Sequence, residues 1–398
     1  MKYIVILGDG MADYPLDELG GKTPLEIARK PYMDKIASMG KIGLVKTVPD
    51  NLSPGSDVAN LSVLGYDPNI YYTGRSPLEA ASIGVDLSQG DASFRVNLVS
   101  LSDEDKYSEK TMLDYSSDEI TTKEAQIIIS DINEKLGNEY LKFYSGVSYR
   151  HLLVWHGCDT GYELTPPHDI SGKKISNYLP GSPVLTELMV QSHEILKTHP
   201  VNRDRYERGL KMANSIWIWG QGSKPNLPSF YEKYKVKGCV ISAVDLVKGI
   251  GICASLDSIS VEGATGNINT NYDAKAKAAL SALCDSDFVY VHIEAPDECG
   301  HRFETANKVK AIELIDDKIV RPIFETLTSQ NIDFSILVMP DHPTPLSLGT
   351  HTKDPVPFAL YRTGDNNSGS TYCEKNAKGG LFIEEGHKLL DYIFRRMI

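Results

Sequence analysis

The stretch PDHPTPLSLGTHTKDPVPF, Pro340–Phe358, decides how the rest of this sequence is interpreted. It follows DFSILVM, Asp333–Met339, which predicts a buried strand because the run is short, apolar and ended by a proline. Asp341 and His342 leave the end of that strand together, and His351 follows on a loop rich in Gly, Thr and Pro. One carboxylate and two imidazoles in this arrangement suit a divalent metal ion, although a surface loop with two unrelated histidines has the same pattern.

Composition indicates an ordinary globular protein with room for two domains. The chain has 398 residues, of which 41% are hydrophobic and 24% are charged. A formal net charge of −12 without any Lys/Arg run argues against a nucleic-acid partner. No stretch approaches a membrane span, so we expect no membrane partner. The segment MKYIVILGDG predicts a strand rather than a secretion signal, and six scattered cysteines fit a reduced, cytoplasmic protein.

Two further predicted strands also end near acidic residues. Lys2–Leu7 is an apolar run followed by Asp9, and Asp287–Ile293 is followed by Asp297 and His301. Four residues apart, Asp297 and His301 share one face of a helical turn and can chelate one ion. Open parallel sheets place their ligands at the carboxyl ends of strands. Each aspartate taken alone is also a common turn residue.

The order of predicted elements indicates an α/β fold. Strands and helices alternate at both ends of the chain, which predicts a parallel sheet sandwiched by helices. The pattern changes from about Asp91, where Phe94–Leu101, Leu141–Tyr149 and His151–Gly157 predict antiparallel strands. We therefore expect a smaller inserted α+β domain at 91–179. The main domain would combine 1–90 with 180–398, including two helices at Pro183–Thr198 and Pro200–Asn214 and a strand at Ile216–Trp219.

Ser56 follows the turn Pro54-Gly55 and precedes a predicted helix at Asp57–Leu64. As an N-cap, this serine would satisfy free backbone amides and do nothing else. As a nucleophile, it would gain from the same helix N-terminus, which favours the alkoxide and an incoming phosphoryl group. The Pro-Gly-Ser pattern leaves both interpretations open.

Four residues are weaker candidates for substrate contacts. Arg75 lies in a turn and can clamp a carboxylate or phosphate, although such an arginine is often solvated or paired. His168 and Asp169 lie in the irregular stretch TPPHDIS and are either turn formers or site residues. Arg150 stands between two of the predicted antiparallel strands.

Together these motifs resemble the alkaline phosphatase superfamily, and more closely its cofactor-independent phosphoglycerate mutases of archaeal type. The resemblance covers nearly the whole chain and rests on Asp9 in GDGMAD, Ser56 in PGSDVANLSVLGYDP, HIEAPDECGH and the stretch Pro340–Phe358. It implies an alkaline-phosphatase-like fold and two divalent ions, Mn²⁺ first and Zn²⁺ or Mg²⁺ otherwise, with no need for 2,3-bisphosphoglycerate. By resemblance, the ligands of one ion would be Asp297, His301 and His351. Those of the other would be Asp9, Ser56, Asp341 and His342.

The resemblance also implies a reaction. Ser56 would take the phosphoryl group of 3-phosphoglycerate and return it to the other hydroxyl of glycerate, giving 2-phosphoglycerate. The inserted domain would hold the glycerate and exclude water. In the inserted domain of the better-known long mutases, an Arg-Asp pair performs this function, and this chain has no literal match to that pair. Asp169 is the nearest candidate for the acid/base, with His168, Arg150 and Arg75 as candidates for binding substrate.

Other activities share the same motifs. A metal-dependent phosphatase, or a homoserine kinase-like phosphotransferase that takes phosphate from ATP, would use the same serine and ions. The chain has no G-x-x-x-x-G-K-[ST] motif, although such a kinase would not need one. A metal-stabilised binding protein would need a missing ligand, whereas all seven positions are filled. The expected partner is a small phosphorylated substrate, and the sequence leaves open the native metal and a possible homo-oligomer.

Overall fold

The computed structural model describes residues 1–394 and divides into two compact units. The large unit contains Met1–Tyr72 together with the chain from Asn226 onward, and the small unit contains Thr73–Pro225. The chain therefore leaves the large unit once and returns to it once, as expected for an inserted domain. No helix in the described residues combines the length and the apolar character that a membrane span requires.

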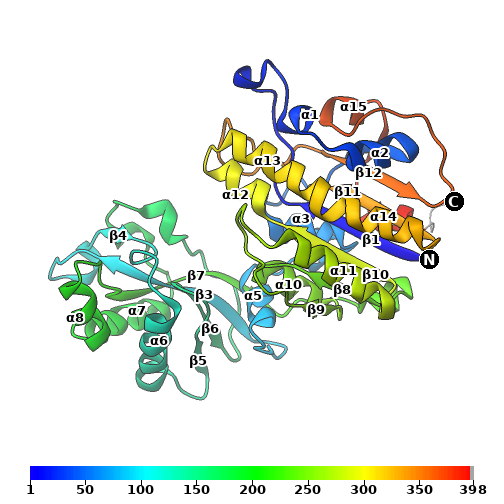
Figure 1. Cartoon of the computed structure of the whole chain (residues 1–398). Helices are drawn as coiled ribbons and strands as arrows, with labels where there is room; N and C mark the ends of the chain where they lie inside the picture. The colour runs from blue at the N-terminus through cyan, green and yellow to red at the C-terminus, as the bar shows by residue number, and fades with distance from the viewer. Residues whose placement is uncertain (395–398) are drawn as a thin grey trace. The chain divides into compact units, whose positions relative to one another are not determined.

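The large unit is built on an eight-stranded sheet in the order β13-β2-β12-β11-β1-β10-β8-β9 (Figure 1). The expected α/β fold is confirmed, with one difference: β12 is antiparallel to both β11 and β2, so the sheet is mixed. Strand β12 returns beside β11 after a loop without a crossover helix, and such a connection produces an antiparallel pair. The strands are β1 (Lys2–Gly8), β2 (Lys41–Val45), β8 (Gly238–Ile241), β9 (Asp257–Ile259), β10 (Phe288–Ile293), β11 (Phe334–Met339), β12 (Val356–Arg362) and β13 (Leu381–Ile383).

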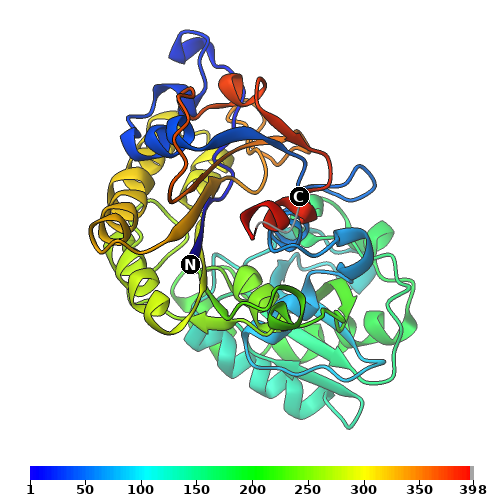
Figure 2. The same cartoon turned by 90° about the vertical axis from the view of Figure 1, so that its right-hand side faces the viewer.

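Helices cover both faces of this sheet. Ile4 and Ile6 of β1 belong to one buried cluster, whereas Val5, equally buried, points to the opposite face. Strands buried on both faces read as continuous apolar runs, which explains the sequences of β1, β10 and β11. The first face is covered by α2 (Pro31–Met39), α11 (Tyr272–Asp285), α13 (Thr305–Ile315) and α14 (Arg321–Ser329). The opposite face is covered by α3 (Ser56–Val63), α10 (Asp245–Cys253) and α16 (Leu389–Ile393), and the two sets are separated in Figure 2.

Short helical turns complete the large unit. They are the 3-10 turn η1 (Asp17–Leu19), α1 (Pro24–Ile27), α4 (Pro68–Tyr71), α9 (Phe230–Tyr234), α12 (Ala295–His301), the π-helical turn η5 (Asp316–Val320), α15 (Glu374–Ala377) and η6 (Gly386–Lys388). The predicted helix at Asp57–Leu64 is α3, which begins one residue earlier than expected, at Ser56.

The small unit holds an antiparallel sheet in the order β4-β3-β6-β5, with β7 pairing β3 on its other side. Its strands are β3 (Ala92–Leu101), β4 (Met112–Asp114), β5 (Leu141–Tyr144), β6 (Arg150–Trp155) and β7 (Ser215–Ser223). Its helices are α5 (Ser76–Ser82), η2 (Tyr107–Glu109), α6 (Thr122–Leu136), η3 (Pro167–Ile170), η4 (Ile175–Tyr178), α7 (Pro183–Leu196) and α8 (Pro200–Glu207).

This unit is wider than the segment 91–179 that we expected. Strand β7, assigned from sequence to the main sheet, pairs with β3 instead, in the register Val96↔Ile218. Leu185 and Met189 of α7 pack in the same core as Trp217 of β7. Helix α7 and strand β7 therefore bury their apolar faces against β3, and the boundary moves to Pro225.

A buried ion pair joins α13 to the segment that follows β1. Lys308 Nζ lies 2.7 Å from Asp13 Oδ2, and both side chains are completely buried. The ammonium also donates to the carbonyl oxygen of Thr344 at 2.8 Å and to that of Ala12 at 3.4 Å. Lys308 thus has three acceptors, and it connects segments that follow the ends of β1 and β11.

Replacing Lys308 by Met is expected to lower the free energy of unfolding by about 3–5 kcal/mol, because the Asp13 carboxylate would remain buried without its counter-charge. Urea unfolding followed by far-UV circular dichroism measures this, since all three tryptophans lie in the small unit. Lys2→Met is the control: its partner Asp287 is 51% exposed, so the cost should stay below about 1 kcal/mol. Equal losses in the two variants would contradict the assigned importance of the buried pair.

Candidate metal centre and nucleophile

Three neighbouring strands deliver three carboxylates to one edge of the large sheet. Strand β1 lies between β10 and β11, and all three run parallel. Asp9 follows β1, Asp297 follows β10 on the first turn of α12, and Asp341 follows β11. All three are buried, with exposed fractions of 1%, 5% and 0%. The sequence-based expectation that these strand ends converge is confirmed.

One group of possible ligands combines Asp297, His301 and His351. The Nε2 atoms of the two histidines face each other at 2.9 Å, and they lie 3.2 and 3.3 Å from the two carboxylate oxygens of Asp297. His301 Nδ1 lies 2.9 Å from the carbonyl oxygen of Gly349, a contact that leaves the Nε2 lone pair free for a ligand. The Asp297 carboxylate raises the pKa of His301 to about 9. Two imidazoles and a carboxylate with their lone pairs converging are a donor set that Mn²⁺ and Zn²⁺ accept.

The second group combines Asp9, Asp341 and His342. His342 Nε2 lies 3.5 Å from Asp9 Oδ1 and 3.5 Å from Asp341 Oδ2. Burial, followed by the charges of Asp341 and Asp297, raises the pKa of Asp9 well above its usual value. Asp9 Oδ1 is buried and has no hydrogen-bond partner among the described residues. Buried, mutually repelling carboxylates with an unsatisfied oxygen suit a bound cation, so the residues present fit a second ion.

The Ser56 side chain contacts the second group of possible ligands and does not cap the helix. The N-cap of α3 is Gly55, and Ser56 is the first helical residue. Its hydroxyl oxygen lies 3.2 Å from His342 Nε2 and 3.4 Å from Asp9 Oδ2. The expected N-cap position is therefore wrong by one residue, and the hydroxyl contacts the second group of ligands instead of the backbone amides of α3.

Three residues at this edge escaped the sequence analysis. Asn60, one turn after Ser56, donates to Asp341 Oδ2 and to the Ser56 carbonyl oxygen, both at 2.8 Å. Thr344 donates its hydroxyl hydrogen to Asp297 Oδ1. His292, within β10, lies 2.8 Å from Asp9 Oδ2, and burial lowers its pKa to about 3. A histidine inside an otherwise apolar, buried strand was the one available signal.

The proposed substrate residues all lie in the small unit, and one of them, Arg75, contacts the carboxylate of Glu79. Arg75 Nε donates to Glu79 Oε1 at 3.0 Å, and Arg95, which sequence analysis missed, donates to Glu79 Oε2 at 2.9 Å. Burial raises the pKa of Glu79, but Arg95, Arg75 and Arg150 outweigh it, so the pKa is lowered overall. Three guanidinium groups thus act on one carboxylate, which leaves a net positive cluster.

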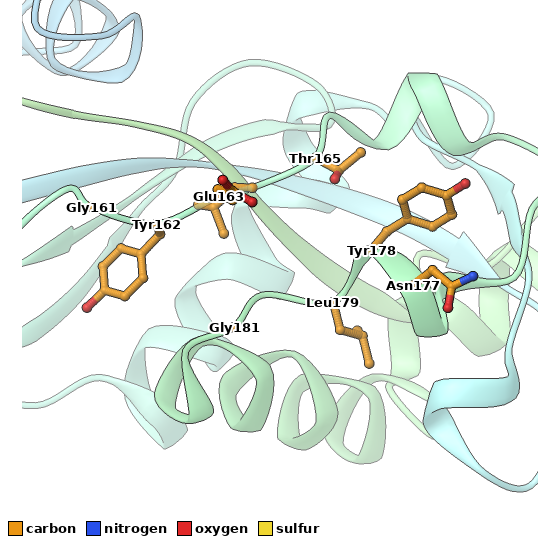
Figure 3. Close-up of a pocket in the computed structure, with 9 residues that line it drawn as sticks. Gly161, Tyr162, Glu163, Thr165, Asn177, Tyr178, Leu179 and Gly181 are labelled. Carbon is orange, nitrogen blue, oxygen red and sulfur yellow. The ribbon is translucent and has the colours of Figure 1, made fainter.

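His168 and Asp169 are placed differently from each other. The His168 ring lies 5.4 Å from that of Trp219, over which the Arg95 guanidinium stacks at 4.2 Å. The Asp169 side chain is 61% exposed, and its Oδ1 atom lies 3.7 Å from His168 Nε2. The segments on either side of His168 and Asp169 in the sequence line a pocket of about 490 Å³. Figure 3 shows the rings of Tyr162 and Tyr178 at its opposite ends. Thr165 lines it, whereas His168 and Asp169 do not.

Comparisons with known proteins place this arrangement in one family. A family model described as 2,3-bisphosphoglycerate-independent phosphoglycerate mutase matches residues 37–202. A protein of that name from Methanosarcina barkeri is 53% identical, with 96% of each chain covered. A probable one from Geobacter sulfurreducens is 52% identical over the full length of both.

Solved structures agree with these sequence matches. A protein from Pyrococcus horikoshii is 32% identical and superposes with a TM-score of 0.83, covering 100% of this chain and 98% of its own. The cofactor-independent phosphoglycerate mutase from Thermoplasma acidophilum is 26% identical, with a TM-score of 0.68 and both chains fully covered. The fold, the strand-end ligands and these matches lead to one conclusion: the chain belongs to the 2,3-bisphosphoglycerate-independent phosphoglycerate mutases.

Proposed function

We propose that this enzyme interconverts 3-phosphoglycerate and 2-phosphoglycerate through a phosphoserine at Ser56. The observation that carries the proposal is the position of the Ser56 hydroxyl, within 3.4 Å of both His342 Nε2 and Asp9 Oδ2 and at the first residue of α3. Free backbone amides and the positive end of the helix dipole favour an incoming phosphoryl group at this place. A phosphatase or a homoserine kinase-like enzyme would use the same contacts, and the similarity to phosphoglycerate mutases favours the mutase among them.

The reaction is two successive displacements at phosphorus. In the first, the bond from Ser56 Oγ to phosphorus forms while the bond to the 3-oxygen of glycerate breaks. In the second, the 2-oxygen of glycerate attacks and the bond to Ser56 Oγ breaks. Ser56 loses its proton in the first step and regains one after the second. A proton also leaves the 2-hydroxyl and one reaches the 3-oxygen, and we assign that transfer to Asp169.

The residues proposed to hold metal are those that the sequence motifs indicate. Asp297, His301 and His351 would bind one divalent ion, and Asp9, Ser56, Asp341 and His342 would bind the other. Imidazole nitrogen together with carboxylate oxygen favours Mn²⁺ or Zn²⁺ over Mg²⁺. When bound, such ions neutralise charge on the transferring phosphoryl group and lower the pKa of the serine hydroxyl.

The small unit is proposed to bind the glycerate and keep water from the phosphoserine. Its positive cluster of Arg75, Arg95 and Arg150, with His168 beside it, supports this assignment, because guanidinium groups bind carboxylates and phosphates bidentately. We further infer a glycolytic role in the cytoplasm. Six free cysteines are consistent with a reducing compartment.

Purified protein with Mn²⁺ should convert 3-phosphoglycerate to 2-phosphoglycerate and release little inorganic phosphate. Trapping during turnover should add phosphate to the peptide containing PGSDVAN, and mass spectrometry should assign it to Ser56. Ser53, which precedes the turn, is the control and should stay unmodified. Parallel reactions with ATP and homoserine test the kinase alternative. Transfer from ATP instead of mutase turnover, free hydrolysis, or phosphate on Ser53 would overturn the proposal.

Replacing Ser56 by Ala should separate catalysis from helix capping. Turnover should fall roughly a million-fold, as for other lost nucleophiles. The free energy of unfolding of the metal-free protein should change by less than about 0.5 kcal/mol, because the hydroxyl caps nothing. Asn271→Ala is the matched control: its side chain accepts from Ala274 N at the start of α11, so about 1 kcal/mol should be lost. A Ser56→Ala variant as destabilised as Asn271→Ala, with activity retained, would restore the capping interpretation.

Replacing Asp341 or His342 by Ala should remove one bound ion per chain, measured by elemental analysis after loading with Mn²⁺. Turnover should fall at least roughly 100-fold, because an ion contributes several kcal/mol of transition-state stabilisation. Circular dichroism should remain unchanged, since both residues follow β11 rather than belong to it. Asp287→Ala, at the opposite end of β10, should keep both ions. Full metal content and activity in the Asp341 and His342 variants would refute the two-metal assignment.

A further inference from the structure

His292 occupies a central position that no sequence motif assigned. It lies on β10, directly opposite Leu7 of β1, and is completely buried. Its Nε2 atom is 2.8 Å from Asp9 Oδ2, and its Nδ1 atom is 3.2 Å from Ser242 Oγ, just after β8. The backbone at this point is also held, because the buried Lys275 donates from Nζ to the His292 carbonyl oxygen at 3.0 Å.

Two roles are compatible with these distances. His292, Asp9 and Asp341 each offer an atom within 4.8 Å of the others, so His292 qualifies by distance as a direct metal ligand. Alternatively, it orients Asp9, as residues behind metal ligands commonly do. The two roles require different atoms to carry the ring proton, because a nitrogen that binds metal must present a lone pair.

The hydrogen bonds decide between these roles. With the proposed cation bound, the Asp9 carboxylate is ionised and can only accept, so the nitrogen 2.8 Å from Asp9 Oδ2 must carry the proton. Nδ1 then accepts, and the Ser242 hydroxyl lies nearer to it, at 3.2 Å, than to its other acceptor, the Val244 carbonyl oxygen, at 3.4 Å. Ser242 Oγ in turn accepts from Val244 N at 2.9 Å, which orients the hydroxyl. This arrangement satisfies the polar atoms of these contacts: Nε2 carries the proton and the lone pair of Nδ1 accepts from Ser242, so neither nitrogen is free to bind a metal.

We propose that His292 is a positioning residue that donates from Nε2 to Asp9 Oδ2 and thereby directs Asp9 Oδ1 at the metal. Asp9 Oδ1 fits this role, since it has no hydrogen-bond partner in the described chain and lies 3.5 Å from His342 Nε2. The Ser242 hydroxyl, 3.2 Å from Nδ1, favours the form of His292 that carries its proton on Nε2. The inference rests on the proposed metal centre, and it assigns His292 outside the set of direct ligands.

The test compares Co²⁺ binding by the wild-type enzyme, His292→Gln and His292→Leu, with affinity from competition titration and coordination from the visible absorption spectrum. His292→Leu should bind the second ion about 10–100-fold more weakly, because Asp9 loses its donor. His292→Gln retains an N–H donor near the position of Nε2 and should restore most of that affinity.

The absorption spectrum of the fully Co²⁺-loaded protein should be the same in the wild-type enzyme and in both variants. His151→Gln, a buried histidine of the small unit, is the matched control and should change nothing.

The outcomes separate this inference from the proposed function. A wild-type enzyme that binds no ion would overturn the proposed metal centre. Normal wild-type binding, with both variants losing one ion or one nitrogen from the cobalt spectrum, would show His292 to be a ligand and overturn the inference alone. Unchanged affinity in His292→Leu would overturn it as well. If the Leu variant does not fold, nitrogen-15 spectra of Zn²⁺-loaded wild-type protein still decide: a proton on Nε2 supports the inference, and a proton on Nδ1 refutes it.

Discussion

Three carboxylates buried beside one another are the constraint on which the rest of the large unit depends. Asp9, Asp297 and Asp341 lose their hydration and repel each other, and each uncompensated charge costs several kcal/mol. Such an arrangement persists only where favourable packing in the surrounding structure offsets the repulsion and the lost hydration. The parallel strands β11, β1 and β10 do so, because their apolar side chains bury both faces of the sheet and leave only the strand ends polar.

The compensation comes from segments that are far apart in the chain. Asp341 accepts from Gly10 N and from the Asn60 amide, while Asn60 is itself held by the Tyr290 hydroxyl at 2.6 Å. Asp297 accepts from Thr344, whose carbonyl oxygen accepts from Lys308. These hydrogen bonds orient the carboxylates without cancelling their charge. The remaining negative charge favours binding of a cation, and the adjacent imidazoles would favour Mn²⁺ or Zn²⁺ over Mg²⁺.

The sequence predicted the strand-end carboxylates, which the structure brings together, better than it predicted the contacts around them. Asp9, Asp297 and Asp341 were found because each follows an apolar run, and a strand end is a local feature. His292 and Asn60 were missed because their roles depend on which strand and helix lie opposite, as in the pairing of His292 with Leu7. The same limit explains the domain boundary: the assignment of β7 depends on its pairing with β3, and nothing within Ser215–Ser223 specifies that partner. The capping position of Ser56 differed by one residue, which is the usual uncertainty of a helix end.

The central position of β1 has a consequence for how the enzyme is made. Tyr3 pairs with Phe288, and Lys2 pairs with Phe334, so β1 acquires both neighbouring strands only after β10 and β11 have been synthesised. The small unit draws every element from Thr73–Pro225 and can fold while translation continues. His351, one of the residues proposed to hold metal, is synthesised after every element of the small unit. The order of synthesis thus allows the insertion to fold before the proposed metal site is complete.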